Sequence, residues 1–337
     1  MKVAVVGGGV VGLTTSLLLR RELRNAEVTV LASDFDDTVS HVAAGIFRVG
    51  ASYSGPTERI TRQWIRDSYE YYDNIRKSEE ASHAGVIDIA GYMFANSSPS
   101  TVENHWIEDL VPIYRRATEE ELRLVGGDWK YGSYFSTLLT QCSLYLPWAR
   151  QQLQADGVTL RRRKLRSLDE LAGEFDLVMN CSGLGARELC NDKRMVSLRG
   201  QVIKVKAPWI KTFFYGELDT YVIPGCHSVV TLGGSRSFDS ENTRLCRHES
   251  AAIRERCDAL VPSLRHAETV RQEVGLRPHR EGNVRVEADF MRDGRSNRVI
   301  VVHNYGHGGY GVCTAPGTAM YALRLAVDAH KSSTAKL

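Results

Sequence analysis

The chain has 337 residues, of which 43% are hydrophobic and 25% charged, with a formal net charge of +3. This balance is ordinary for a soluble protein with one large or two medium domains, and the small charge does not suggest a nucleic-acid or membrane partner. No apolar run approaches the ~20 residues of a membrane span. Seven scattered cysteines without a CxxC pair predict reduced thiols in an intracellular compartment, and no metal site is expected.

The amino-terminal segment has the pattern of a dinucleotide-binding unit rather than of a signal peptide. A valine-rich run at Val3–Val6 is followed by Gly7-Gly8-Gly9-Val10-Val11-Gly12, which contains G-x-G-x-x-G, and then by helical spacing over Leu13–Leu23. A second strand is expected at Val28–Leu31. It ends near Ser33-Asp34, about 20 residues beyond the last glycine, where such units bind a ribose.

The residues of this loop have separate physical roles. Gly7 permits the tight turn, Gly9 lets the backbone approach a pyrophosphate, and Gly12 lets helix and strand pack closely. Val10 and Val11 begin the helix, whose first N–H groups face the phosphates. The motif alone leaves FAD and NAD open, and it also fits a tight turn that binds nothing.

The next part of the chain alternates between helical and strand patterns. Residues 56–76 predict an amphipathic helix, and residues 85–140 mix short alternating runs with loops. A helix is expected from Leu146 to Ala155 and a strand over Val158–Leu165. The basic run Arg161–Lys164 within that strand could suggest nucleic acid, but it lacks aromatic residues for stacking, so a solvated strand edge is the better interpretation.

The second half changes character. Leu177–Gly183 reads as a buried strand that ends in a glycine turn, whereas short alternating strands with hairpin signals such as Pro224-Gly225 dominate from Leu198 to about Arg298. Val299–His303 reads as a strand again and Ala315–His330 as a final helix.

These patterns predict an α/β protein of two interleaved domains. A Rossmann-like domain is expected from residues 1–50, 141–197 and 298–337. A second domain, on a large mixed or antiparallel sheet, is expected from residues 51–140 and 198–297.

One carboxyl-terminal stretch points to a family. Val302–Gly311, with the sequence VHNYGHGGYG, resembles the carboxyl-terminal signature of the D-amino-acid oxidase family. The resemblance recurs in order along nearly the whole chain, at Val5–Leu13, Val42–Gly45, Tyr145–Trp148, Asn180–Gly183, Arg199–Gln201, Tyr221–Gly225, Thr231–Gly234 and Gly275–Arg280. It implies a two-domain flavoprotein whose FAD-binding domain is the Rossmann-like one. Such an enzyme oxidises a D-amino acid and passes the electrons to oxygen, which yields a 2-oxo acid, ammonia and hydrogen peroxide.

The expected flavin contacts extend beyond the first glycine loop. Their glycine N–H groups and the start of the last helix would stabilise an anionic reduced flavin, although a glycine-rich structural turn is the alternative. His303 and His307 are expected to be structural or close to the flavin, and neither is expected to be catalytic. The further cofactor residues are Ser33, Asp34, Ala43, Ala44, Gly45, Leu165, Ser182, Gly183, Gly306, Gly308, Gly309, Tyr310, Gly311, Cys313 and Thr314.

The resemblance also assigns the substrate site. Arg277 would hold the α-carboxylate by a planar fork that lysine cannot reproduce, and the Tyr221 hydroxyl would assist it. The backbone carbonyl of Gly309 would receive the substrate amine.

Three positions bear on the choice of substrate. Glu217 replaces a second tyrosine of the members that take neutral substrates, and Arg236 falls where members that oxidise D-aspartate carry an arginine for the side-chain carboxylate. Those members carry a further arginine at a position that is Phe214 in this chain, so that arginine has no match here. Arg48, in the loop after Gly45, could add positive charge to the site. The pattern therefore favours D-aspartate, with D-glutamate as a further substrate. Neutral or broad specificity remains the alternative, in which Arg236 is a solvated hairpin residue.

Two other classes of protein stay open at this point. A flavin-free binding or scaffolding protein could keep the fold, and an NAD-dependent dehydrogenase could share the glycine loop.

The final residues Ala335-Lys336-Leu337 are close to the Ser-Lys-Leu address that the peroxisomal import receptor binds. They predict a peroxisomal matrix enzyme, with a cytoplasmic enzyme as the alternative.

Overall fold

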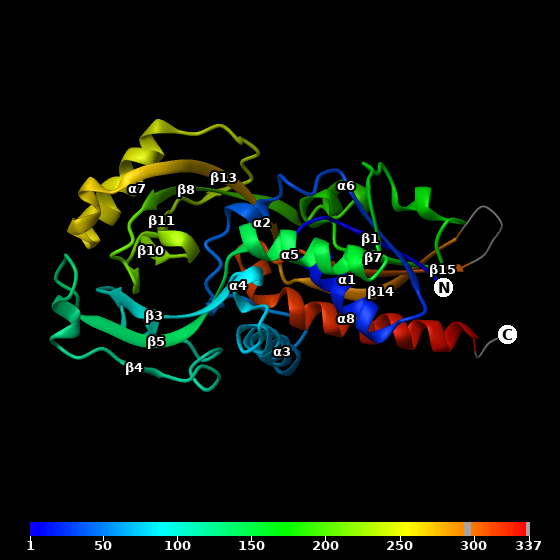
Figure 1. Ribbon diagram of the computed structural model, residues 1–337, viewed down its shortest axis with the longest axis horizontal. Coiled ribbons are helices and arrows are strands. Elements are labelled where there is room, and N and C mark those ends of the chain that lie inside the picture. The colour runs from blue at the N-terminus through cyan, green and yellow to red at the C-terminus, as the bar shows by residue number, and fades with distance from the viewer. Residues whose placement is uncertain (293–297, 335–337) are drawn as a thin grey trace.

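The computed structural model describes residues 1–292 and 298–334, which form two lobes around two β-sheets (Figure 1). One sheet has six strands in the order β14-β15-β7-β1-β2-β6. All its neighbouring strands run parallel except the pair β14–β15. Its strands are β1 (Lys2–Val6), β2 (Glu27–Ala32), β6 (Thr159–Arg162), β7 (Leu177–Asn180), β14 (Arg285–Arg292) and β15 (Arg298–Tyr305).

Long helices cover this sheet. In β1, Val3 and Val5 are fully buried, as expected of a central parallel strand with helices packed on it. The helices pack in the pairs α1–α5, α1–α8 and α3–α8. They are α1 (Val10–Glu22), α3 (Glu58–Arg76), α5 (Cys142–Ala155) and α8 (Gly311–Thr334).

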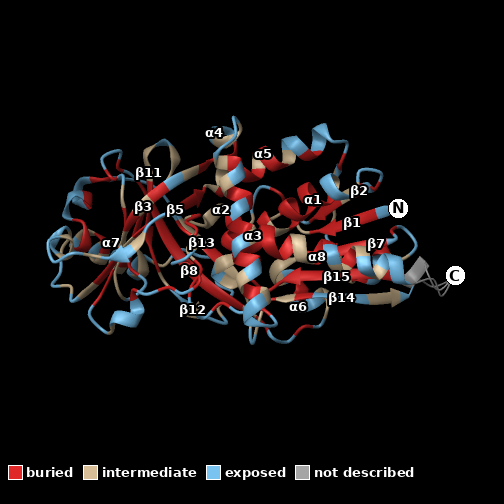
Figure 2. Cartoon of the chain, turned by 90° about the horizontal axis from the view of Figure 1, so that it is seen from below, coloured by how far each residue is buried: buried red, intermediate tan, exposed pale blue. Residues whose placement is uncertain are grey.

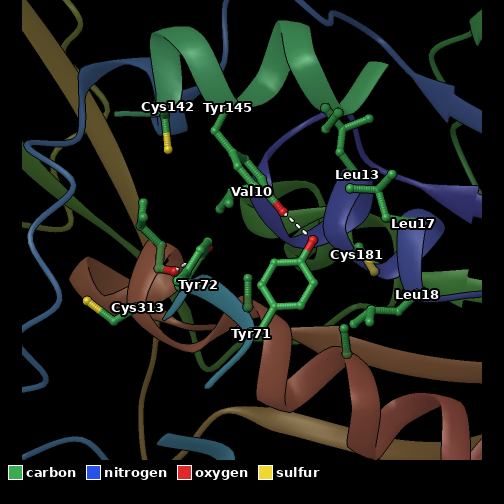
Figure 3. Close-up of a cluster of buried hydrophobic side chains, with 14 of the residues drawn as sticks. Val10, Leu13, Leu17, Leu18, Tyr71, Tyr72, Cys142, Tyr145, Cys181 and Cys313 are labelled. Carbon is green, nitrogen blue, oxygen red and sulfur yellow. Dashed lines mark hydrogen bonds between the residues drawn. The ribbon is translucent and has the colours of Figure 1, made fainter. Parts of the chain in front are cut away.

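Hydrogen-bonded tyrosines join these helices in the core. Figure 3 shows Tyr71 of α3 and Tyr145 of α5 pointing toward each other, with hydroxyl oxygens 3.0 Å apart. The Tyr145 hydroxyl also lies 2.9 Å from the Thr14 hydroxyl of α1. Because a buried hydroxyl without a partner is costly, this chain of bonds fixes α1 and the glycine loop before it against α3 and α5.

The second sheet has nine strands in the order β12-β8-β11-β10-β9-β3-β5-β4, with β13 on the other side of β8. It is antiparallel apart from the parallel pair β3–β9. Its strands are β3 (Val86–Ala95), β4 (Tyr114–Arg116), β5 (Tyr131–Thr140), β8 (Met195–Lys206), β9 (Phe213–Tyr215), β10 (Tyr221–Pro224), β11 (Val229–Gly233), β12 (Ser237–Phe238) and β13 (Glu268–Arg280). The helix α7 (Arg247–Leu260) packs on β8 and β11.

Short helices and turns connect these elements. Buried residues follow the strands of both sheets, while exposed residues gather on the outer helices and loops (Figure 2). The short α-helices are α2 (Val39–Val42), α4 (Ala81–Ala84) and α6 (Ala186–Leu189). The 3₁₀ turns are η1 (Pro99–Thr101), η2 (Glu121–Arg123), η3 (Leu168–Leu171), η4 (Gly183–Gly185), η5 (Cys226–Ser228), η6 (Pro262–His266) and η7 (Gly308–Tyr310).

The predicted α/β class with a Rossmann-like sheet and a large mixed sheet is confirmed. The expected edge position of the basic run is also correct, since β6 is the last strand of its sheet. All seven cysteines lie within the described residues and are free thiols. Across residues 1–292 and 298–334, no helix is long and apolar enough to span a membrane. The same residues contain no cluster of His, Cys, Asp or Glu suited to a metal ion.

Two helices differ from the sequence prediction. The helix α5 begins at Cys142 rather than at Leu146, and Pro147 lies inside it. Its first turn forms because the backbone N–H of Tyr145 donates to Gln141, and burial of Tyr145 anchors that turn. The helix α7 lies in the region where short alternating strands were expected to dominate.

The division into domains stays a prediction, and one strand departs from its expected segments. β14 falls within 198–297 but pairs with β15 in the six-stranded sheet, with Val286 opposite Asn304. Strand partners depend on long-range packing that local alternation does not encode. The sequence pattern therefore indicated that a strand forms here, but not which sheet it joins.

Candidate active site

A cavity of about 1240 Å³ extends along both sheets. Its walls include the glycine loop after β1, the ends of β2 and β7, and the loop between β15 and α8. They continue to Tyr221 and Arg277 of the nine-stranded sheet. Ligands of open α/β sheets bind outside the carboxyl ends of the strands, and this cavity begins at that position.

The three fingerprint glycines are held in different ways. A Cβ on Gly7, whose φ is +129°, would collide with the backbone carbonyl of Cys181, and a Cβ on Gly12 would collide with the carbonyl of Gly7. A Cβ on Gly9 would meet no backbone, only the side-chain hydroxyls of Ser40 at 3.1 Å and Thr38 at 3.9 Å. Gly7 and Gly12 therefore allow close packing, whereas Gly9 borders the cavity, as a residue that faces a pyrophosphate must.

The polar groups along this half of the cavity suit a dinucleotide. Ser182 Oγ and both amide atoms of Asn304 are buried in the cavity wall without a hydrogen-bond partner among the described residues. Ser33 and Asp34 line the same cavity. The N–H groups of Asp36 and Asp37 donate to one Asp34 oxygen, and these bonds lower the pKa of that carboxyl. These orphaned groups and the bare backbone at Gly9 fit FAD.

The carboxyl-terminal glycines form the middle of the cavity wall. Gly306 and Gly308 have φ values of +92° and +58°, which favour glycine. The loop leads through η7 into the N-terminus of α8, where unpaired N–H groups and the helix dipole provide positive potential.

The predicted cofactor residues line this cavity with two exceptions. Gly12 is packed against Gly7 and is absent from the lining, which agrees with its packing role. Thr314 is fully buried in α8 outside the cavity lining, and its hydroxyl donates to the carbonyl of Tyr310 at 2.8 Å. Cys313 itself lines the cavity, with its thiol 3.2 Å from the carbonyl of Ile46.

Glycines make room for the two expected substrate-binding side chains. The ring of Tyr221 packs against Gly233 and Gly234, and the guanidinium of Arg277 packs against Gly200. Arg277 Nη1 donates to the carbonyl of Ser235 at 3.3 Å. Both side chains line the cavity together with Gly309. The structure thus brings together the three residues expected at the α-carboxylate and amine.

The Tyr221 hydroxyl is suited to donate a hydrogen bond. Burial raises the pKa of Tyr221, and the nearby charge of Arg277 reduces that rise. The hydroxyl therefore stays protonated at neutral and moderately alkaline pH.

Of the residues at the positions expected to set substrate choice, Arg236 lines the cavity, whereas Glu217 and Phe214 do not. Arg236 lines the cavity, but its side chain is 52% exposed and forms an ion pair with Asp219 at 2.9 Å. Glu217 does not line the cavity, because its carboxylate accepts the backbone N–H groups of Asn96 and Ser97. Phe214 also lies outside the lining, stacked on a neighbouring tyrosine.

Tyr215 and Met93 are among the cavity residues that sequence reasoning missed. Tyr215 of β9 lies opposite Tyr221 of β10, with ring centroids 5.6 Å apart, and Met93 of β3 lies opposite Tyr215. Alternation along 213–215 could have placed Tyr215 on one sheet face. The partner strands, which decide which face borders the cavity, could not be read from it.

The two histidines of the carboxyl-terminal motif are buried and neutral. His303 lies 3.1 Å from the Asn180 amide outside the cavity lining, and burial lowers its pKa to about 4. His307 Nε2 lies 3.0 Å from the Thr318 hydroxyl, and burial lowers its pKa to about 3. Neither ring takes up a proton near neutral pH, so this geometry supports the expectation that they are not catalytic.

Residues 2–325 match the model of the DAO family, which is described as FAD dependent oxidoreductase. The chain belongs to this family. FAD is accordingly its cofactor, and the cavity of this DAO-family enzyme provides a glycine loop, orphaned polar groups and a helix N-terminus that would hold it.

Relatives cover nearly the whole chain. D-aspartate oxidase from Homo sapiens is 39% identical over 96% of this chain and 94% of its own length. D-aspartate oxidase 1 from Caenorhabditis elegans is 31% identical over 98% of both. D-amino-acid oxidase from Streptomyces coelicolor is 33% identical over 96% of both.

Solved structures share the fold at lower identity. Glycine oxidase from Geobacillus kaustophilus superposes with a TM-score of 0.76 at 18% identity, covering 96% of this chain and 93% of its own. Glycine oxidase from Bacillus cereus gives 0.75 at 17% identity, with 95% and 93% covered.

Proposed function

We propose that this DAO-family enzyme oxidises acidic D-amino acids, D-aspartate above all and D-glutamate in addition. The products are the 2-oxo acid, ammonia and hydrogen peroxide. The relatives named D-aspartate oxidase from human and nematode support this choice, at 39% and 31% identity over nearly the full chain.

One observation carries the proposal. Arg277 and Tyr221 lie side by side in the cavity that also contains the flavin-facing glycine segments, and Arg236 lines the same cavity. A guanidinium next to a tyrosine hydroxyl binds a carboxylate in a fixed orientation. A second guanidinium in reach of the substrate side chain favours an acidic one.

The residues contribute mainly by orientation. Arg277 and Tyr221 would hold the α-carboxylate, and the Gly309 carbonyl would accept an N–H of the amine, which fixes the α-carbon in one position. Such positioning supplies a large part of the rate in reactions without acid-base steps. When bound there, FAD would supply the acceptor for the α-hydrogen and its two electrons and would pass these electrons to oxygen, and water would hydrolyse the released imino acid.

The proposed hydride transfer requires no side chain that acts as a general base. His303 and His307 are neutral, buried and already hydrogen-bonded, and Tyr221 is protonated. The neutral amine of the substrate supplies the electron pair that assists departure of the hydride.

Neutral or broad specificity is the second candidate. The ion pair between Arg236 and Asp219 favours it, because a guanidinium already bound to a carboxylate attracts another one less strongly. The two candidates differ in one measurement. Peroxide release is compared for D-aspartate, D-glutamate, D-alanine and their L-forms. A D-alanine rate equal to that of D-aspartate would exclude the preference for acidic substrates. Turnover of the L-forms would exclude the proposed specificity for D-amino acids.

We also propose that the enzyme works in the peroxisomal matrix. Ala335, Lys336 and Leu337 lie outside the described residues, and the proposal concerns a chain that ends with them. Two points support it: the tripeptide has the small, basic and leucine pattern of the import address, and hydrogen peroxide is best released beside catalase. The import receptor would be the protein partner, in addition to substrate and oxygen.

Fluorescent fusions test this location. An amino-terminal tag should give peroxisomal puncta, and deletion of Leu337 should disperse them. A diffuse signal from the intact tagged chain would favour the cytoplasm instead.

A further inference from the structure

Five arginines line the cavity, and they fall into two groups. Three are paired with carboxylates of the protein: Arg163 with Glu174 at 2.9 Å, Arg236 with Asp219 at 2.9 Å, and Arg280 with Asp192 at 2.8 Å. The other two, Arg48 and Arg277, have no carboxylate within 4.0 Å among the described residues. A cavity that keeps two guanidinium groups free of internal carboxylates is prepared for a ligand with two carboxylates.

Arg48 is presented by a rigid piece of backbone. The N–H of Phe47 donates to the carbonyl of Leu138 at 2.7 Å, and the hydroxyl of Thr137 donates to the carbonyl of Phe47 at 2.7 Å. On the other side, the Asn104 amide donates to the carbonyl of Val49 at 2.8 Å. These bonds fix the residues before and after Arg48, so its side chain leaves the backbone in a set direction.

One donor edge of the Arg48 side chain has no oxygen acceptor among the described residues. Its Cζ lies 4.8 Å from the centre of the Tyr215 ring, and this stacking holds the guanidinium flat. Its Nε is buried without a partner, and Nη2 meets only the thioether of Met93, a weak acceptor, at 3.5 Å. The Nε–Nη2 edge is the pair of parallel donors that binds a carboxylate at two points.

The same ring connects Arg48 to the α-carboxylate site. Tyr215 contacts the guanidinium of Arg48 and also packs on Tyr221, with centroids 5.6 Å apart. Arg48, Tyr215, Tyr221 and Arg277 therefore form one continuous stretch of the cavity wall.

We infer that Arg48 binds the distal carboxylate of the substrate through its Nε–Nη2 edge and is a specificity-determining residue. The inference rests on the proposed oxidation of acidic D-amino acids. It gives Arg48 a larger share of the preference than Arg236, because Arg236 is half-exposed and must first leave Asp219, whereas Arg48 is shielded and has no ion pair to break.

Equilibrium binding to the flavin-loaded enzyme tests this role. Succinate has the carbon skeleton of D-aspartate without the amine, and butyrate has the same length with one carboxylate fewer. Their dissociation constants are measured from changes in the flavin absorption spectrum. In Arg48→Gln we expect the constant for succinate to rise about 10- to 100-fold, as for loss of a charge-assisted contact, and that for butyrate to change much less.

Two further variants make the result specific. Arg48→Lys keeps the charge but loses the two-point edge, so succinate should bind with intermediate strength. Arg115→Gln is a matched control, because Arg115 also stacks on a tyrosine, Tyr134, at 4.6 Å but pairs with Glu121 outside the cavity lining. This control should leave both dissociation constants unchanged.

The outcomes separate the inference from the proposed function. If the wild-type enzyme prefers neither succinate over butyrate nor D-aspartate over D-alanine, the proposed function fails. If the wild type shows both preferences and Arg48→Gln keeps them, or weakens succinate and butyrate equally, Arg48 is not the distal-carboxylate residue. Greater loss in Arg236→Gln than in Arg48→Gln would also overturn the inference.

Discussion

At the scale of single residues, exposure decides how much a charge contributes. Arg236 fits the position expected from the sequence, but half of its side chain is in solvent and Asp219 competes for it. Exposed ion pairs are worth about 1 kcal/mol or less, since water screens them and side-chain ordering opposes them. The same amino acid in a shielded wall, as at Arg48, interacts more strongly with a bound carboxylate.

The pair of Arg236 and Asp219 gives a prediction in two directions. Arg236→Ala should raise KM for D-aspartate by about fivefold, corresponding to about 1 kcal/mol. Asp219→Asn should lower that KM, because it leaves the guanidinium without its internal partner. Steady-state assays with D-aspartate and D-alanine would show this. An equal change for both substrates would mean that the pair affects the cavity mouth and not the distal carboxylate.

The histidines lead to a prediction about pH. His303 and His307 have pKa values lowered to about 4 and about 3 by burial, and burial raises the pKa of Tyr221. None of the three therefore changes charge between about pH 6 and 9. The value of kcat/KM for D-aspartate should rise toward alkaline pH as the substrate amine loses its proton. A limb near pH 6.5 that disappears in His303→Asn or His307→Asn would contradict hydride transfer without a base.

At the scale of elements, the glycine loop separates folding from cofactor binding. Gly7 and Gly12 touch backbone, so any side chain there strains the fold, whereas a Cβ on Gly9 meets only the hydroxyls of two side chains, Ser40 and Thr38. Gly9→Val should therefore give folded protein with little bound FAD. Flavin content and circular dichroism of the purified variant measure the two effects. Full flavin content in this variant would show that the pyrophosphate lies elsewhere.

A buried lysine in β8 leads to a stability prediction. Lys204 is 5% exposed, with Nζ 3.0 Å from the Thr231 hydroxyl, and burial lowers its pKa from 10.5 to about 8. Below pH 8 the folded chain holds this charge at a cost, and the cost vanishes above 10.5, where both states are neutral. Lys204→Met should thus stabilise the fold at pH 7 by as much as about 3 kcal/mol.

Thermal unfolding of Lys204→Met at several pH values checks the sign. The gain over the wild type should be largest at neutral pH and shrink between about pH 8 and 10. A pH-independent difference would point to packing rather than charge. The same variant also shows whether Lys204 contributes to the pH profile of kcat/KM, because any change near pH 8 that is due to this lysine should be absent from Lys204→Met.

The sequence predicted the elements whose signals are local. The first strand, glycine loop and helix follow each other without a gap, so their spacing alone indicates the unit. Contacts between different segments could not be predicted from the sequence. Examples are the pairing of β14 with β15, the packing of Tyr215 against Tyr221, and the ion pair between Asp219 and Arg236. Thr314 shows the same limit, because a shift of one residue on α8 turns a side chain from the cavity into the core.

At the scale of the whole molecule, the cavity connects the two sheets. Its walls come from the six-stranded sheet at the glycine loop and from the nine-stranded sheet at Tyr221 and Arg277. A ligand that spans both contributes its binding energy to holding the lobes together. Binding of FAD should therefore stabilise the chain as a unit and not only the Rossmann-like lobe.

Removal and return of FAD test this coupling. At free FAD one hundred times the dissociation constant, linkage predicts a gain of about 2.7 kcal/mol, which should raise the melting temperature by several degrees. FMN lacks the adenylate that would reach Ser33 and Asp34, so it should give a smaller shift at equal concentration. Hydrogen exchange should slow in β10 and β13 as well as in β1 when FAD binds. Equal shifts for FAD and FMN, or protection confined to β1 and its neighbours, would show that the glycine loop and the substrate sheet do not share one ligand.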